Sequence, residues 1–326
     1  MYDFTVLILE GAFSSSVAIT RDILATAEVL AKRLGAAPLR WRLCSVEGGT
    51  VRLQGDMTID TVKLPMNTTD DCSVWIVPGL GLNTHEAIRQ RFEKPDAITI
   101  IRALAQHAEY GGQVAASCSA VFMLNAAGLL NGRRVTTTWW LAPLLQNIAP
   151  NCTVDADRMV CVDGQVITAG AAFAQSDLML HLLRERCGNA LRDSVSRMML
   201  IDGRQAQAPF ILPEVLASGN DLVALIAARI EKALPTLPSV GELAQEFCMS
   251  ERTLSRHIHK ATGKSTLALI QSVRLRCARN LLENSRLNVE QVAAAVGYQD
   301  ATALRRLMKK TAGANPSKYR TILDYV

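Results

Sequence analysis

The sequence predicts an α/β fold: a parallel sheet sandwiched by helices, followed by an all-α domain with two helix-turn-helix units. Short apolar runs alternate with helical stretches up to Gly188, nothing beyond Asp221 resembles a strand, and the helical part repeats itself at an offset of about fifty residues. A chain of 326 residues also exceeds what one hydrophobic core normally serves. We therefore expect domains over 1–202 and 220–326, joined by a proline-containing linker over 203–219.

Four β-rich runs define the predicted sheet: 4–11, 41–46, 73–80 and 111–118. Apolar stretches such as Val6–Leu9 and Val74–Val77 are continuous rather than alternating, which is typical of strands buried on both faces. Helices must then cover the sheet. The amphipathic stretch Val17–Leu34 and helical stretches at about 120–127 and 171–186 are the candidates, which indicates a layered α/β domain.

Composition indicates a globular protein of a reducing compartment. Hydrophobic residues make up 49% of the chain and charged residues 20%. No run reaches the roughly 18 apolar residues of a membrane span, and the N-terminal apolar run lacks the basic region of a signal peptide. None of the eight cysteines has C-x-x-C spacing, so we expect reduced thiols rather than disulfides. We expect a cytoplasmic protein with no cofactor, no metal and no membrane partner.

Each copy of the repeat in the helical half opens with a capping residue and an apolar stripe. Ser239 and Asn288 are the capping residues, and Glu242 and Gln291 stand three positions later to close a capping box. A tight turn follows, and a second helix starts from Ser250 or Asp300. Helix, short turn, helix is the geometry that lays a second helix in the DNA major groove.

The second helices turn Leu254 and Ile258, or Leu304 and Met308, inward. Their outward residues, which we expect to contact double-stranded DNA, are Arg252, Ser255, Arg256, His259, Thr302, Arg305, Arg306 and Lys309. The charge distribution agrees, because residues 236–326 carry 14 Lys and Arg against 7 Asp and Glu. Solvated helix faces are the alternative, but they do not explain why arginine recurs outward in both copies. Arginines 274, 276 and 279 on the helix between the units would hold their spacing or meet the DNA backbone.

Residues 240–320 resemble the AraC/XylS family of transcription regulators. The second copy, VEQVAAAVGYQD…RRLMKKTAGANPSKYR, follows that family's signature through the Gly297-Tyr298 turn to Pro316–Arg320. The resemblance implies two adjacent major-groove contacts. It also implies that Arg252, Ser255, Arg256, Thr302, Arg305 and Arg306 read bases.

In the first half, AASCSAVFMLNAAGLL places Cys118 directly between a buried strand and a helix. A side chain at such an elbow lies at the carboxyl edge of the sheet beneath the amides of a helix N-terminus, which can lower a thiol pKa or hold an anionic ligand. The segment PGLG at 78–81 would supply further backbone donors at the same edge.

This half resembles the PfpI, or class I glutamine-amidotransferase-like, superfamily, and both halves together resemble the AraC regulators that carry such a domain at the N-terminus. The resemblance rests on VPGL, the Cys118 elbow, AGLLNGRRVTTTWW and AGAAFAQSDLMLHLLRERCG. It implies a flavodoxin-like sheet. Enzymes of the superfamily pair the elbow cysteine with a histidine and an acidic residue of the first loop. Here Ser119 follows the cysteine, Thr138 stands where regulators of this branch commonly carry histidine, and serines 14–16 occupy the first loop.

We therefore expect a non-catalytic domain that binds a small-molecule effector, with a pocket lined by Ser14, Ser15, Ser16, Gly79, Leu80, Cys118, Ser119, Thr138 and Trp139. The alternatives for Cys118 are a redox or covalent sensor and a catalytic nucleophile. His85 and His107 are expected at the surface and His181 in the core, while Asp177 caps or braces the sheet.

These expectations describe a ligand-responsive, DNA-binding transcription activator that forms a homodimer through its first domain. As an activator it would also contact RNA polymerase. The resemblance implies an effector from amino-acid or quaternary-amine metabolism. The alternative from another class is a cysteine hydrolase or amidase that uses Cys118.

Overall fold

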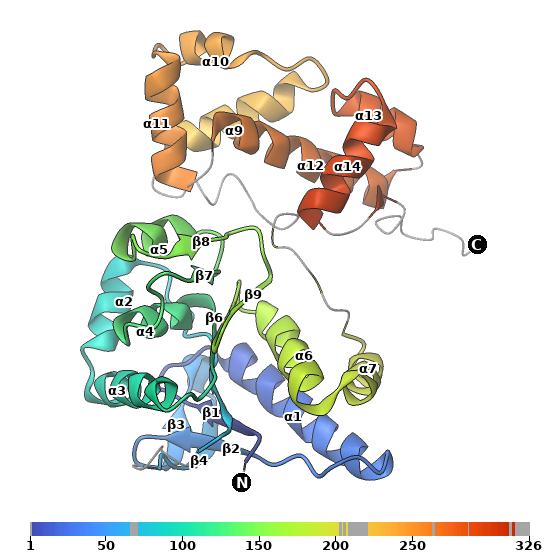
Figure 1. The fold of residues 1–326 in the computed structure, drawn as a ribbon. Helices are drawn as coiled ribbons and strands as arrows, with labels where there is room; N and C mark the ends of the chain where they lie inside the picture. The colour runs from blue at the N-terminus through green and yellow to red at the C-terminus, as the bar shows by residue number, and fades with distance from the viewer. Residues whose placement is uncertain are drawn as a thin grey trace. The chain divides into compact units, whose positions relative to one another are not determined.

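The computed structural model describes residues 2–65, 71–201, 204, 207, 221–262, 265–285, 287–312 and 315–316. The chain forms two compact units, Met1–Arg204 and Gln205–Val326 (Figure 1). Except for Arg204 and Gln207, the expected linker over 203–219 lies outside the described residues. Within them, no helix is both long and apolar enough to cross a membrane.

The first unit is built on an eight-stranded sheet in the order β3-β4-β2-β1-β5-β6-β10-β9. The edge pairs β3–β4 and β9–β10 are antiparallel, and the pairs between them are parallel. Every residue of β1, β5, β6 and β10 is buried. The continuous apolar runs predicted this for β1 and β5, whereas β10 was not among the predicted strands. The strands are β1 Phe4–Leu7, β2 Trp41–Ser45, β3 Gly49–Arg52, β4 Thr58–Lys63, β5 Val74–Val77, β6 Val114–Ser117, β9 Val160–Asp163 and β10 Val166–Ala169. A separate pair joins β7 Arg134–Val135 to β8 Thr153–Val154.

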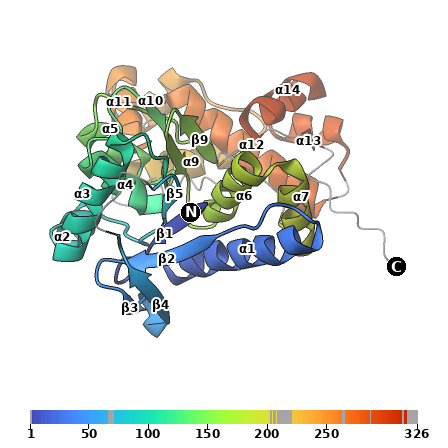
Figure 2. The same ribbon diagram turned by 60° about the horizontal axis from the view of Figure 1, so that its bottom comes forward.

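Helices cover both faces of this sheet (Figures 1 and 2). On one face α1 Ser14–Arg33 packs with α6 Ala174–Cys187 and α7 Asn189–Met198. The opposite face carries α2 His85–Phe92, α3 Pro95–Glu109, α4 Val121–Ala126 and α5 Ala142–Ile148. The short 3-10 turns are η1 Gln54–Asp56 and η2 Cys118–Ala120. The predicted sandwich is confirmed.

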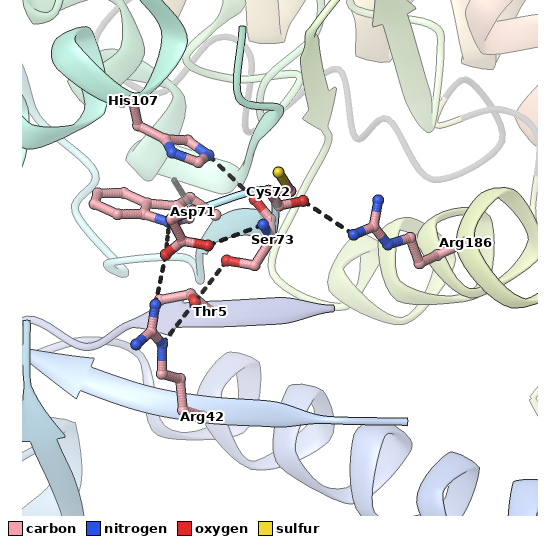
Figure 3. A network of polar contacts seen from close by, with 8 residues as sticks. Thr5, Arg42, Asp71, Cys72, Ser73, His107 and Arg186 are labelled. Carbon is pink, nitrogen blue, oxygen red and sulfur yellow. Dashed lines mark hydrogen bonds and ion pairs between the residues drawn. The ribbon is translucent and has the colours of Figure 1, made fainter. Parts of the chain in front are cut away.

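Two predictions about the first unit need correction. Helix α1 begins at Ser14, three residues earlier than its apolar stripe suggested, so serines 14–16 form its first turn instead of a loop. His107, expected at the surface, is fully buried. Its ring stacks on Trp75 with 4.4 Å between centroids, and Nε2 lies 3.1 Å from the Ser73 carbonyl oxygen (Figure 3). The histidine lies on the inner face of α3, where the indole and a backbone acceptor offset its burial.

The same buried network contains an ion pair (Figure 3). Asp71 accepts hydrogen bonds from Arg42 Nη2 at 2.5 Å, the Ser73 amide at 2.9 Å and Trp75 Nε1 at 3.2 Å. Burial alone would raise the pKa of the Asp71 carboxyl, but the hydrogen bonds from Ser73 and Trp75 and the charge of Arg42 outweigh it and hold the pKa below its ordinary value. The network ties β1, β2 and β5 to the inner face of α3.

The buried imidazole should make the first unit less stable in mild acid. Burial lowers the pKa of His107 despite the charge of Asp71 and backbone hydrogen bonds at Ser73 and Gln113. The pKa of histidine in an unfolded chain is about 6.5. Below that pH the unfolded chain binds more protons than the folded one, so the free energy of unfolding should fall from pH 7 towards 5, by at most about 1.4 kcal/mol per pH unit for one group.

His107→Phe keeps a ring against Trp75 and cannot titrate, so it should remove part of that slope. Urea unfolding followed by tryptophan fluorescence measures it, because all four tryptophans lie in the first unit. The pKa of His181 is also lowered, by burial and Arg184, so some slope should remain. His85→Phe, at an exposed position, is the control and should keep the full slope. An unchanged slope in His107→Phe would refute the assignment.

The second unit consists of helices in its described part: α9 Asp221–Ala233, α10 Val240–Glu246, α11 Glu251–Thr262, α12 Thr266–Asn284, α13 Val289–Ala295 and α14 Ala301–Ala312. It has two hydrophobic cores. Leu269 and Val273 of α12 pack with α9, α10 and α11, whereas Leu275, Ala278 and Leu282 pack with α13 and α14. The long helix therefore joins the two repeats by contributing to both cores, and the predicted all-α domain is confirmed.

Candidate nucleic-acid interface and candidate ligand site

The first repeat forms a helix-turn-helix from α10 and α11. Ser239 Oγ accepts from the Glu242 amide at 3.2 Å, and Glu242 Oε2 accepts from the Ser239 amide at 2.7 Å, so the predicted capping box is present. After the turn, Ser250 Oγ accepts from the Thr253 amide at 3.2 Å and starts α11. Cys248, with φ 54°, provides the reversal between the two helices.

The second repeat has the same construction in α13 and α14. Asn288 and Gln291 exchange side-chain to amide hydrogen bonds of 2.8 Å. Asp300 Oδ1 accepts from the Thr302 and Ala303 amides at 2.6 and 3.0 Å and starts α14. Gly297, with φ 81°, makes the turn. Both predicted helix-turn-helix units are therefore formed.

The outward faces of α11 and α14 are polar. Leu254, Ile258, Leu304 and Met308 are buried, as the pattern predicted. Among the described residues, Arg252 and Arg256 have no hydrogen-bond or ion-pair partner. Ser255 differs from the rest because it is half-buried and its Oγ lies 3.1 Å from Thr266 Oγ1. The residues predicted to contact DNA that lie exposed are Arg252, Arg256, His259, Thr302, Arg305, Arg306 and Lys309.

One difference between the two repeats lies next to these faces. Arg305 Nη2 of α14 forms an ion pair with Glu290 Oε1 of α13 at 2.9 Å. Glu290 follows the first residue of α13, and the same place in α10 is occupied by Gly241. Arg305 is thus held by its own helix pair, whereas its neighbour Arg306 is exposed on the adjacent side of α14.

Arg274 of α12 holds the second turn. Its Nε donates to the Val296 carbonyl at 2.8 Å, Nη2 donates to the Gly297 carbonyl at 2.5 Å, and its guanidinium lies 3.5 Å from the Tyr298 ring centroid. Arg276 of the same helix binds Glu231 of α9 at 2.5 Å. Arg274 and Arg276 thus both connect helices of the second unit, which fits the first of the two roles that we expected. Contact with the DNA backbone, the second role, stays a prediction.

In the first unit, Cys118 occupies a strained elbow at the carboxyl edge of the sheet. Strand β6 ends at Ser117, and Cys118 then adopts φ 56°, a left-handed conformation that non-glycine residues rarely take. The Cys118 amide donates to the Gly170 carbonyl at 2.7 Å, and Thr137 Oγ1 donates to the Cys118 carbonyl at 2.7 Å. These bonds fix the elbow between β10 and the segment before α5.

The thiol of Cys118 is buried, and no basic side chain in the described part of the chain bonds to it. Burial raises its pKa above the ordinary value, although hydrogen bonds from the Ser119 backbone and side chain and from the Gly81 backbone oppose this. Among the described residues, the side-chain hydrogen bond of Sγ is to Ser119 Oγ, at 3.9 Å. A protonated thiol beside a hydroxyl is a poor nucleophile.

Part of the predicted ligand site lies together. An added Cβ at Gly79 would meet Cys118 Cβ at 2.9 Å and Ser16 Oγ at 3.1 Å, so these residues are in direct proximity. Ser119 Oγ accepts from the Leu82 amide at 3.1 Å. Thr138 Oγ1 is buried and, within the described residues, has no hydrogen-bond partner. Such an orphaned hydroxyl is the kind of group that a polar ligand or water satisfies.

The other predicted lining residues have contacts of their own. Ser14 Oγ donates to the Gln54 carbonyl, Ser15 is half-buried, and Trp139 packs edge-on against Trp140 at 4.9 Å between centroids. Leu80 lines a separate hollow of about 260 Å³ together with Glu10, Gly11, Arg52, Leu53, Leu82, Arg91 and Lys94. Arg91 is already engaged there by Asp96.

Sequence reasoning missed two residues near the elbow. Gln175 is fully buried on α6, where its Nε2 donates to Thr20 Oγ1 of α1 at 2.8 Å. Arg204 binds Asp177. The sequence predicts that Asp177 caps or braces the sheet, but its partner Arg204 lies 27 residues later and no local pattern identifies that arginine. For Gln175, the available signal was a glutamine within an apolar helix.

Comparison with known proteins agrees with both halves. A model of the DJ-1/PfpI family matches residues 18–185, and a model of a helix-turn-helix domain matches residues 243–322. HTH-type transcriptional regulator CdhR of Pseudomonas aeruginosa is 28% identical over 305 residues, which cover 90% of this chain and 85% of that protein. HTH-type transcriptional regulator GlxA of Rhizobium meliloti is 30% identical over 274 residues, which cover 82% of each chain.

Among solved structures, an AraC family transcriptional regulator from Pseudomonas putida has a TM-score of 0.51 at 20% identity, and the match covers 61% of this chain and all of that one. At this identity the likeness concerns the fold.

Proposed function

Because the chain belongs to the DJ-1/PfpI family and continues into an AraC-type helix-turn-helix domain, we propose that it is a sequence-specific DNA-binding transcription activator controlled by a small molecule. The observation that carries DNA binding is the pair of exposed basic faces on α11 and α14, each set on a capped helix-turn-helix. One polar helix face is common in soluble proteins, but two at the same place in a repeat are typical of DNA readers.

The effector would bind at the Cys118 elbow of the first unit. Ser16, Gly79 and Cys118 meet there, and the orphaned Thr138 hydroxyl supports a polar occupant. An amino acid or a quaternary amine is the class we propose. Homodimerisation through the first unit, contact with RNA polymerase and a cytoplasmic location complete the proposal.

We propose that the first unit does not catalyse a reaction. The buried, protonated thiol of Cys118 supports this, as does the lack of a basic side chain bonded to it among the described residues. A cysteine hydrolase would need a thiolate beside a base. We therefore expect no hydrolase or amidase turnover from the wild type, and turnover that disappears in Cys118→Ala would favour the hydrolase instead.

The test is binding of the full-length protein to double-stranded DNA from upstream of its own gene, followed by fluorescence anisotropy at several salt concentrations. We expect the association constant to fall steeply with salt, because lysines and arginines displace counterions from the phosphates. An unrelated fragment of equal length is the control and should bind at least about a thousandfold more weakly. Repeating the titration with amino acids, betaines and polyamines tests the effector. The proposal fails if no DNA shows salt-dependent binding.

A further inference from the structure

Segment 170–177, which leads into α6, contacts the candidate ligand site directly. The Gly170 carbonyl accepts the amide of Cys118 at 2.7 Å, and the Ala172 carbonyl accepts Ser16 Oγ at 3.2 Å. Gln175 extends the contact to Thr20 of α1 through its Nε2, and its Oε1 is buried without a hydrogen-bond partner in the part of the chain that is described. The segment therefore forms one wall of the site.

The same segment also bonds Arg204, the last residue of the first unit. The Arg204 amide donates to Asp177 Oδ1 at 2.6 Å, and Nε and Nη2 donate to Oδ2 at 3.1 and 2.7 Å. Nη2 also donates to the Phe173 carbonyl at 2.6 Å. The Asp177 side chain is 3% exposed and that of Arg204 35%, and Arg204 is the ion-pair partner of this buried carboxylate among the described residues. Two guanidinium nitrogens share Oδ2 while the Arg204 amide takes Oδ1, so these charge-assisted bonds require a specific geometry.

The candidate ligand site is closely packed where this segment borders it. The space beside Gly79 is bounded by Cys118 Cβ and Ser16 Oγ at 2.9 and 3.1 Å from an added Cβ. An occupant that accepts the Ser16 hydroxyl proton, as a carboxylate would, takes that donor from the Ala172 carbonyl. The displaced carbonyl precedes Phe173, whose own carbonyl holds Arg204. The carbonyl that contacts the site and the carbonyl that contacts Arg204 thus belong to consecutive residues.

We propose that the Asp177–Arg204 pair is a latch, through which occupancy of the site beside Cys118 controls the start of the connection to the DNA-binding unit. This inference rests on the proposed function, because it concerns how the same ligand site regulates DNA binding. A filled site moves residues 172–173, and the guanidinium loses the Phe173 carbonyl and is pulled away from Asp177 Oδ2. Arg204, the last residue of the first unit, is then released.

Three variants of the full-length protein test the latch without a known ligand. Gly79→Ala places a methyl group where an occupant would sit. Arg204→Gln removes the guanidinium. Arg204→Lys keeps the charge but loses the second nitrogen donor, and it is used in place of Arg204→Gln if the glutamine variant does not fold. The control is Arg186→Gln, which breaks an ion pair of 3.4 Å to Asp3 at the other end of α6. Hydrogen exchange over residues 170–187 and the dissociation constant for the upstream DNA fragment are the two measurements.

We expect Gly79→Ala and Arg204→Gln each to speed exchange at 170–177 and to change the DNA dissociation constant in the same direction, by at least about fivefold. In the double variant the two effects should not multiply, because both act through one contact. The control should leave the DNA dissociation constant unchanged. The latch is overturned if Arg204→Gln matches the wild type in both measurements, or if the effects multiply. Failure of the wild type itself to bind DNA would instead overturn the proposed function.

Discussion

Replacing Gly297 with alanine is expected to disrupt the second helix-turn-helix while leaving the first unit folded. Gly297 has φ 81°, which costs an alanine about 1–2 kcal/mol in conformation alone. Its added Cβ would also lie 2.3 Å from the Pro235 carbonyl oxygen, a backbone atom that cannot rotate away. The turn must shift, and Arg274 then loses its bonds to the Val296 and Gly297 carbonyls. We expect loss of α13 and α14 from the folded core.

The measurement is thermal unfolding followed by circular dichroism at 222 nm, which reports both units, beside tryptophan fluorescence, which reports the first unit alone. The dichroism should show an early transition in the variant that the fluorescence does not. Gly241→Ala is the matched control: it lies within α10, and the atom nearest to its Cβ would be Glu251 Oε1 at 2.9 Å, the far end of a rotatable side chain. Alanine is favoured there by about 1 kcal/mol. Equal unfolding of both glycine variants would contradict the argument.

Removing the guanidinium of Arg306, which we expect to contact a guanine bidentately, should weaken binding to the cognate DNA by about 1–3 kcal/mol, roughly fivefold to more than a hundredfold. The side chain is exposed on α14, and the helix is anchored below it by Leu304 and Met308. Preference for one base pair should relax at the same time. Arg256→Ala should do the same through the first repeat.

Two neighbours serve as controls for that experiment. Lys309→Ala should lower affinity evenly for all sequences and reduce the salt slope by about one, the signature of a phosphate contact. Arg305→Ala should have a smaller effect than Arg306→Ala, because Arg305 is paired with Glu290 and must leave that carboxylate to reach DNA. Fluorescence anisotropy with single base-pair substitutions measures all three. An even loss over all sequences for Arg306→Ala would place it on the backbone instead.

The helical half was well described by its sequence because the information that forms it is local. Capping boxes at Ser239 and Asn288, apolar residues at helical spacing and a glycine in the second turn specify each element within a few residues. Repetition of the pattern then identified the architecture. The buried strands β1, β5 and β6 were predicted for the same reason, since continuous apolar runs need no partner to be recognised.

The hairpin of β3 and β4 at one edge of the sheet was not predicted, because its residues are mostly exposed and polar and take their form from pairing with each other. His107 was misplaced since its burial depends on Trp75, a partner distant in the chain. For the candidate ligand site, the strand-to-helix pattern located Cys118, but which side chains lie beside it depends on how α1 and the segment before α6 pack at the sheet edge.

The sequence by itself determined the two architectures, the helix-turn-helix repeat and its outward arginines, because periodicity, caps and turns act over short distances. Tertiary structure alone decided that Arg305 is paired, that Arg274 holds the second turn, and that Asp177 binds Arg204. Each of these contacts joins residues from different elements, and their geometry is set by packing rather than by spacing along the chain.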